Sequence, residues 1–120
     1  MAYRELSPAK QEQLLRLRQF EQTVQNLRIQ LNEINRTLTE IEMTKKELLA
    51  LDEEAEVWKT VGQVMLPKKV KTVLKDLENR AELLELKKKS FTSQEASNVK
   101  RLEELQTRLS EELGLSQPSN

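Results

Sequence analysis

Apolar residues recur at alternating steps of three and four positions through most of this 120-residue chain. This alternation keeps a narrow apolar stripe in line on an α-helix, and two supercoiled helices can bury such a stripe between them. The first stripe comprises Leu17, Phe20, Val24, Leu27, Leu31, Ile34, Leu38, Ile41 and Leu48. It predicts a long helix over residues 8–53, with Ser7 as the N-cap and Pro8 in the first turn.

A second stripe with the same spacing follows in the other half of the chain. Its apolar members are Val70, Leu74, Leu77, Ala81, Leu84, Phe91, Leu102, Leu105 and Leu109. It predicts a helix over residues 67–113, which begins at Pro67 and stops before Gly114, because glycine suits the left-handed conformation after a helix. Residues 114–120 are then a tail.

Four polar residues occupy positions of the two stripes. A polar residue at such a position usually fixes register in a coiled coil. We interpret them in this way rather than as a ligand site: Lys45, Lys88, Glu95 and Asn98.

The two predicted helices are almost equal in length, so they should fold back on each other. In that antiparallel frame residue i faces about residue 125 minus i, which places Leu48 near Leu77 and Leu17 near Leu109. The predicted fold class is therefore mainly α, with two long antiparallel coiled-coil helices joined by a single short β-hairpin. We expect one such unit to span residues 1–120.

The segment that joins the helices favours β-structure. It reads EVWKTVGQVMLPK from Glu56 to Lys68 and contains the only tryptophan of the chain. Valine, threonine, tryptophan and methionine cluster on both sides of Gly62-Gln63, which suits a tight turn. We expect a hairpin over residues 55–66, with strands near 57–61 and 64–66.

A lone two-stranded hairpin is marginal in water, and its open edges can pair with other chains. A two-helix coil has no third layer on which the hairpin could rest. We therefore expect hairpins of other subunits to bury the following residues: Val57, Trp58, Val61, Gly62, Val64, Met65 and Leu66. The alternative is a plain connector whose apolar residues cap the coil, although a connector needs only a few residues.

The composition excludes several classes of function. Lys plus Arg is 20 and Asp plus Glu is 20, so a basic nucleic-acid surface is not expected. Cys and His are absent, which removes the usual zinc, haem and Ser-His or Cys-His sites. We expect no catalytic residue, no metal and no cofactor, and thus no enzyme. The chain shows no signal-peptide core and no membrane-length apolar run, so we expect a cytoplasmic protein without a membrane partner.

The order of helix, EVWKTVGQVML and helix resembles a β-type prefoldin subunit. The likeness extends from about Gln13 to Leu109 and is most specific in TKKELLALDEEAEVWKTVG, where VW-x-x-VG is typical of the family. LELKKKSF, followed by EASNVKRLEEL, is most similar to eukaryotic prefoldin subunit 1, whose Lys-Lys-hydroxyl-aromatic element matches residues 88–91. Two features depart from the family pattern. Met65 stands where an aromatic residue is common, and Pro67-Lys68-Lys69 stand where the second strand is often longer.

The resemblance implies a subunit of a hexameric chaperone that consumes no nucleotide. In that family six hairpin-bearing subunits form a double β-barrel platform with coiled-coil arms. The arm tips hold non-native chains, such as actin and tubulin, which then pass to the cytosolic group II chaperonin. The tip residues of this chain would be Tyr3, Leu6, Leu14, Leu15, Leu113 and Leu115.

Two alternatives stay open at this point. The leucines near the chain ends could be ordinary frayed ends of a coil. The chain could also be a structural coiled-coil adaptor or dimerisation protein with no chaperone activity.

Overall fold

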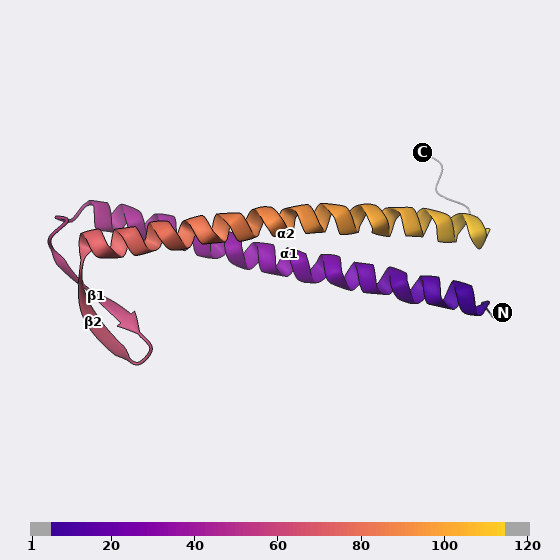
Figure 1. The fold of residues 1–120 in the computed structure, drawn as a ribbon, viewed down its shortest axis with the longest axis horizontal. Helices are drawn as coiled ribbons and strands as arrows, with labels where there is room; N and C mark the ends of the chain where they lie inside the picture. Colours follow the sequence, from indigo (N-terminus) through magenta and orange to yellow (C-terminus); the bar gives the residue numbers. More distant parts are fainter. Residues whose placement is uncertain (1–5, 115–120) are drawn as a thin grey trace. The chain divides into compact units, whose positions relative to one another are not determined.

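The computed structural model describes residues 6–114, in which two helices flank two strands (Figure 1). Helix α1 spans Pro8–Leu49, and helix α2 spans Val70–Glu112. Strand β1 is Glu56–Val61 and strand β2 is Val64–Lys69, and the two form an antiparallel hairpin. The predicted fold class, two long helices with one hairpin between them, is confirmed. No helix of the described part of the chain is long and apolar enough to cross a bilayer.

The chain divides into two compact units. The hairpin unit is Leu31–Ser90, and it holds the hairpin with the adjoining segments of both helices. The terminal unit combines Met1–Gln30 with Phe91–Asn120.

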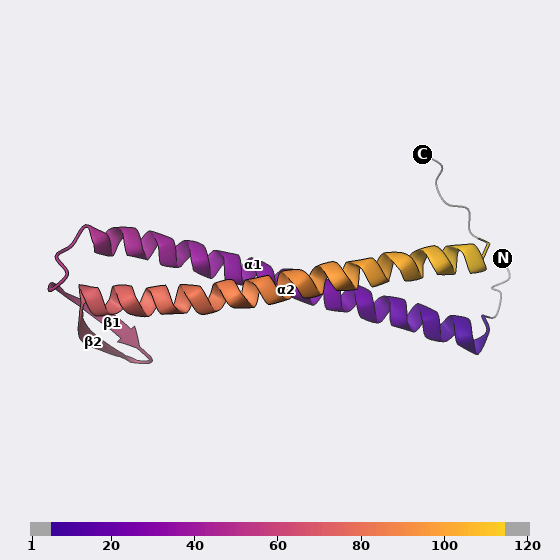
Figure 2. The ribbon, with the colours of Figure 1, turned by 45° about the horizontal axis from the view of Figure 1, so that its top comes forward.

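Ion pairs show how the helices run in the terminal unit. Lys10 of α1 pairs with Glu112 of α2, and Arg28 of α1 pairs with Glu95 of α2, so the two segments are antiparallel (Figure 2). The frame estimated from the sequence places about residue 115 opposite Lys10 and about residue 97 opposite Arg28. The ion pairs therefore lie two or three positions from that estimate.

The predicted apolar stripes are the least exposed parts of both helices. Their buried members are Val24, Leu27, Ile34, Ile41, Leu48, Val70, Leu105 and Leu109. Every other member of the two stripes is half-buried, including the four polar positions. The 3-4 spacing thus identified the side chains that each helix buries.

The start of α1 agrees with the prediction, whereas its end does not. The backbone N–H of Lys10 donates to the Ser7 hydroxyl at 3.2 Å, as expected of an N-cap, and Pro8 is the first helical residue. The helix ends at Leu49 rather than at residue 53. Beyond the end, the Asp52 carboxylate accepts the Glu54 N–H at 2.8 Å, and the Asp52 carbonyl accepts the Ala55 N–H at 3.0 Å, so residues 52–55 form a turn and not a last turn of the helix.

The start of α2 also differs from the prediction. The helix begins at Val70 and not at Pro67, because β2 continues through Pro67 to Lys69. The N–H groups of Val70 and Lys71 donate to the backbone carbonyls of Ala55 and Glu53 in the connector, at 2.9 and 3.0 Å. At the other end α2 stops at Glu112, and Gly114 takes the predicted left-handed conformation with φ of +68°. Residues 115–120 of the predicted tail lie outside the described part.

Candidate functional site

The hairpin has a two-residue loop, as the sequence predicts. Val61 pairs with Val64, and Gly62 and Gln63 lie between them. Gly62 has a φ of +60°, whereas no described residue other than glycine has a positive φ. A positive φ at the first loop position alone defines a type II′ turn, whose twist suits the flanking strands. The strands are longer than predicted, since they begin at Glu56 and end at Lys69.

Both faces of the hairpin carry large apolar side chains. Successive side chains of a strand point to opposite faces. The pairing therefore places Val57, Val61, Val64 and Leu66 on one face with Lys59 and Lys68. It places Trp58, Met65 and Pro67 on the other face with Glu56, Thr60 and Lys69.

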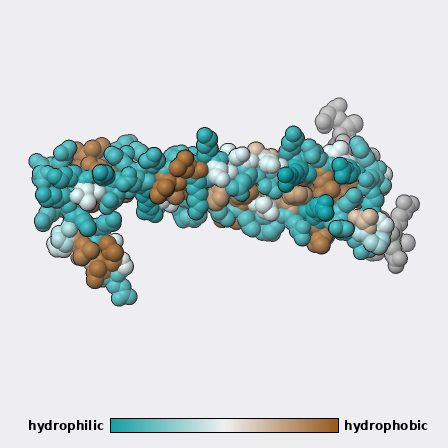
Figure 3. Space-filling model, viewed as in Figure 1, coloured by the Kyte–Doolittle hydropathy of each residue, from teal (hydrophilic) through white to brown (hydrophobic). Residues whose placement is uncertain are grey.

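The apolar side chains of the hairpin are open to solvent in the single chain. Trp58 is 64% exposed, Met65 59% and Val64 55%, and the hairpin forms an apolar patch in Figure 3. Val61 and Leu66 are also exposed, and only Val57 is half-buried. The root of the coil therefore does not cover these residues. A sheet that is apolar on both faces needs other protein to cover it.

The two edges of the hairpin are not equivalent. In a hairpin with a two-residue loop the pair next to the loop is hydrogen-bonded, and hydrogen-bonded and non-hydrogen-bonded pairs then alternate. By this count the pair of Trp58 and Pro67 is non-hydrogen-bonded, so both backbone nitrogens point away from the partner strand. Pro67 therefore costs the hairpin no bond, which is why β2 tolerates it. The outer edge of β2 lacks a donor there, whereas the outer edge of β1 keeps the N–H groups of Glu56, Trp58 and Thr60.

Ion pairs hold the root of the hairpin, which is the end away from the turn, where Glu54 lies close to Lys69 and Lys71. The Glu54 carboxylate accepts hydrogen bonds from Lys69 at 2.8 Å and from Lys71 at 2.6 Å. These two ammonium groups lower the pKa of Glu54 to about 2, and the Glu54 carboxylate raises the pKa of Lys69. Lys59 of β1 also lies 3.6 Å from Asp76 of α2. The three ion-paired lysines thus tie the strands and the start of α2 to acidic residues around them.

The predicted tip residues differ in their exposure. Leu6, Leu14 and Leu113 are half-buried, and only Leu15 is exposed, at 57%. Tyr3 and Leu115 lie outside the described residues. The ion pair of Lys10 with Glu112 joins the two helices close to these leucines.

The polar positions of the stripes have local partners. Arg28 donates to Glu95 across the helices at 2.8 Å, which suits the predicted control of register. Lys45 lies 3.8 Å from Glu42 of its own helix. The Asn98 side chain donates to the Gln94 carbonyl at 2.7 Å, one turn earlier in its own helix. Of these three positions, only Glu95 has its polar partner on the opposite helix.

Comparison with known proteins decides the family. The model of the prefoldin subunit family matches residues 11–115. The chain is 35% identical over 114 residues to prefoldin subunit beta of Methanothrix thermoacetophila, with 95% of each chain covered. It is 33% identical over 113 residues to prefoldin subunit beta of Saccharolobus islandicus, which covers 94% of this chain and 90% of the relative. The crystal structure of the prefoldin beta subunit from Thermococcus strain KS-1 matches with a TM-score of 0.78 and 25% identity, over 97% of this chain and 100% of that chain.

The chain belongs to the prefoldin β-subunit family. Prefoldin subunits form complexes with one another as parts of a chaperone, and the family is not enzymatic. In this prefoldin chain the hairpin is the element whose apolar side chains are not covered by other parts of the described structure. Among the described residues no three His, Cys, Asp or Glu side chains gather in a way that could hold a metal ion.

Sequence reasoning missed the charged root of the prefoldin hairpin. Glu54 is 15 residues from Lys69 and 17 from Lys71, so no local spacing links them. Only the register of the hairpin brings them together. The feature of the sequence that could have indicated these ion pairs is the run of acidic residues before β1 together with the lysines after Leu66.

Proposed function

We propose that this chain is the β-type subunit of a hexameric, ATP-independent co-chaperone in the cytoplasm. Its hairpin joins a β-platform with the other prefoldin subunits. The ends of its helices help to hold non-native proteins, such as actin and tubulin, for delivery to the group II chaperonin. The observation that carries the proposal is the hairpin, whose two faces are both apolar and both exposed.

The energetics support assembly through the hairpin. Burying a large apolar side chain is worth roughly 1.5–3 kcal/mol, and several such side chains stand open on twelve strand residues. A lone hairpin of this size has little stability of its own. Covering both faces with hairpins of other subunits therefore provides the main stabilisation of this element.

The identity of the subunit rests on a short segment of α2. Lys88, Lys89, Ser90 and Phe91 match the element typical of eukaryotic prefoldin subunit 1. We therefore assign the chain to that subunit type, with distinct chains as its neighbours in a hetero-hexamer.

Native mass spectrometry of the complex purified from its own cells tests the proposed assembly. We expect a hexamer of distinct small coiled-coil chains that contains one copy of this one. A homodimer of this chain would contradict the proposal and would support a coiled-coil adaptor instead.

Trimming the helix ends tests the holding of non-native chains. Deletion of residues 1–13 and 112–120 removes Leu6 and Leu113 but leaves the apolar stripe from Leu17 to Leu109 intact. We expect normal assembly and a partial loss in the suppression of aggregation of denatured actin, since the other subunits contribute ends too. Full protection after every subunit has been trimmed would refute the holding role. Failure of the trimmed chain to assemble would show that the ends are structural.

A further inference from the structure

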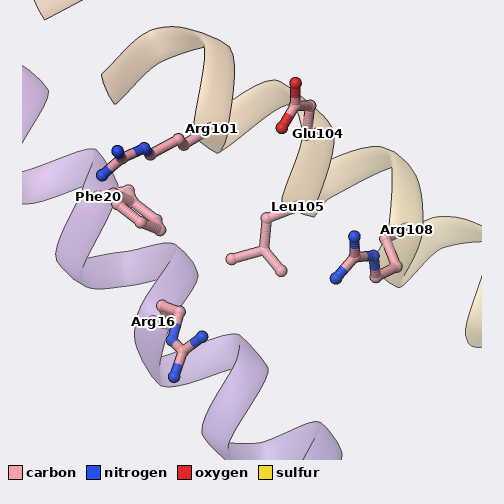
Figure 4. Close-up of a pocket in the computed structure, with 6 residues that line it drawn as sticks. All are labelled: Arg16, Phe20, Arg101, Glu104, Leu105 and Arg108. Atoms are coloured by element: carbon pink, nitrogen blue, oxygen red, sulfur yellow. The ribbon is translucent and has the colours of Figure 1, made fainter. Parts of the chain in front are cut away.

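A shallow groove in the terminal unit combines an apolar floor with arginines. Phe20 of α1 and Leu105 of α2 form the floor; Phe20 is half-buried and Leu105 is buried. Arg16 of α1 lines the groove together with Arg101 and Arg108 of α2 (Figure 4). In Figure 4 the Arg101 guanidinium points toward Phe20 of the other helix, and the Arg108 guanidinium points toward Leu105. All three arginines are exposed, so they can reach a ligand on the floor.

The groove carries more positive than negative charge, because its three arginines are accompanied by Glu104 and, through Arg16, by Glu12. Glu104 is the only acidic residue that lines it, and Figure 4 shows its carboxylate turned away from the floor. Arg16 forms an exposed ion pair with Glu12 of its own helix at 3.8 Å, and 61% of its side chain is exposed. Within residues 6–114 no acidic side chain lies within 4.0 Å of a guanidinium nitrogen of Arg101 or Arg108. The groove therefore offers guanidinium groups that a ligand can use.

We propose that this groove binds an acidic peptide segment that also carries an apolar side chain. A guanidinium binds a carboxylate through two parallel hydrogen bonds, so acidic side chains suit the three arginines. Leucine or a similar side chain of the same segment covers Phe20 and Leu105. Nucleic acid fits less well, because the chain has no net positive charge and the floor of the groove is apolar.

This site goes beyond the proposed holding of unfolded chains. The leucines at the helix ends would hold any apolar segment, whereas the arginines of the groove select for negative charge. The selection depends neither on the platform nor on the client being unfolded. A failure of either proposal can therefore be observed without a failure of the other.

Peptide binding to the reconstituted complex tests the selection by charge. The probe is a fluorescent peptide in which Glu and Leu alternate. It is compared with one peptide that has Lys in place of Glu, and with another that has Ser in place of Leu. We expect the Glu-Leu peptide to bind most tightly, to weaken as salt is added, and to shift the methyl resonances of Leu105. Equal binding of the Lys-Leu peptide would overturn the proposal.

A matched pair of variants locates the site. The groove variant combines Arg16→Gln, Arg101→Gln and Arg108→Gln, and we expect it to bind the Glu-Leu peptide about tenfold more weakly. The control variant has the same net charge and combines Arg18→Gln, Arg36→Gln and Arg80→Gln, three exposed arginines outside the groove. We expect its affinity to stay within about twofold of wild type. Equal losses in both variants, with helix content unchanged by circular dichroism, would show non-specific attraction and would overturn the site.

Discussion

The hairpin exposes most of its large apolar side chains, whereas most of those in the described part of the terminal unit are buried or half-buried. Among the described residues, the terminal unit exposes only Leu15 and Ile29 of its large apolar side chains. The twelve strand residues of the hairpin expose five: Trp58, Val61, Val64, Met65 and Leu66. In the terminal unit each helix buries its stripe, whereas the hairpin has nothing of its own to bury against. This contrast supports the proposal that the hairpin forms a permanent interface, whereas the helix ends make weak, reversible contacts.

The largest expected effect comes from placing charge on the hairpin. Val61→Asp with Val64→Asp changes the pair beside the turn, and each valine is worth roughly 1.5–3 kcal/mol when buried. We expect the affinity for partner subunits to fall by about a hundredfold or more, with helix content kept. Co-purification with tagged partners measures it.

The control for this variant changes exposed leucines elsewhere. Leu83→Asp with Leu86→Asp alters two side chains of α2 that are 68% and 62% exposed. We expect their complex to form at wild-type yield. Equal loss in both variants would mean that the hairpin has no special role.

A second prediction separates the two edges of the hairpin. Thr60 and Met65 face each other in a non-hydrogen-bonded pair, so the N–H of each points to its own outer edge. We expect Thr60→Pro to weaken assembly about tenfold, since it removes a donor from the continuous edge of β1. Met65→Pro should cost less, although it also removes an apolar side chain, because Pro67 already interrupts the edge of β2. Native mass spectrometry across a concentration series compares them, and a larger loss for Met65→Pro would reverse the assignment of the edges.

A smaller effect is expected in the terminal unit. Arg28→Glu breaks the ion pair with Glu95, whose side chain is 25% exposed, and we expect a loss of about 0.2–1 kcal/mol in the free energy of unfolding of the complex. The double change Arg28→Glu with Glu95→Arg should recover most of it. Urea unfolding followed by circular dichroism measures both. No recovery in the double variant would show that the pair does not help to set the register.

The smallest effect is a local one at the hairpin root. The pKa of Glu54 is lowered from 4.5 to about 2, so its contribution is fully present above about pH 4.5 and is lost as the pH falls toward 2. We expect Glu54→Gln to speed hydrogen exchange of the Val70 and Lys71 amides at neutral pH, since the root is then less firmly held. Glu53→Gln is the control, because only the backbone carbonyl of Glu53 contacts Lys71. Equal protection in wild type and Glu54→Gln would contradict this role.

The sequence predicted the helices better than their ends. Repeated spacing specified which side chains each helix buries, because one error in a long stripe does not change its face. Pro67 misled the prediction, because proline is common in the first turn of a helix and also at a non-hydrogen-bonded position of a strand. The end of α1 was placed too late, because Asp52 and Glu54 form a turn after Leu49 that the apolar spacing does not indicate.

A candidate site was easier to predict from the sequence when its residues lie in one continuous segment. Gly62 and its neighbours form one continuous segment, so the hairpin was evident from the sequence. The groove of Arg16, Phe20 and Arg101 needs two helices in a particular register, and the frame from the sequence was two or three positions away. The partial burial of Leu6, Leu14 and Leu113 depends on the same register, which the sequence alone does not specify.

Pro67 also bears on the risk of fibril formation. VWKTV and VML are short β-favouring segments, and stacked strands of a fibril need a donor and an acceptor on both edges of every layer. A layer made of this hairpin would lack one donor on the β2 side, and Lys68 and Lys69 would add repelling charge beside the gap. Addition of further strands at the β2 edge is therefore disfavoured even when the hairpin is exposed. Pro67, which made the second strand look shorter in the sequence, thus also disfavours fibril formation by the single subunit.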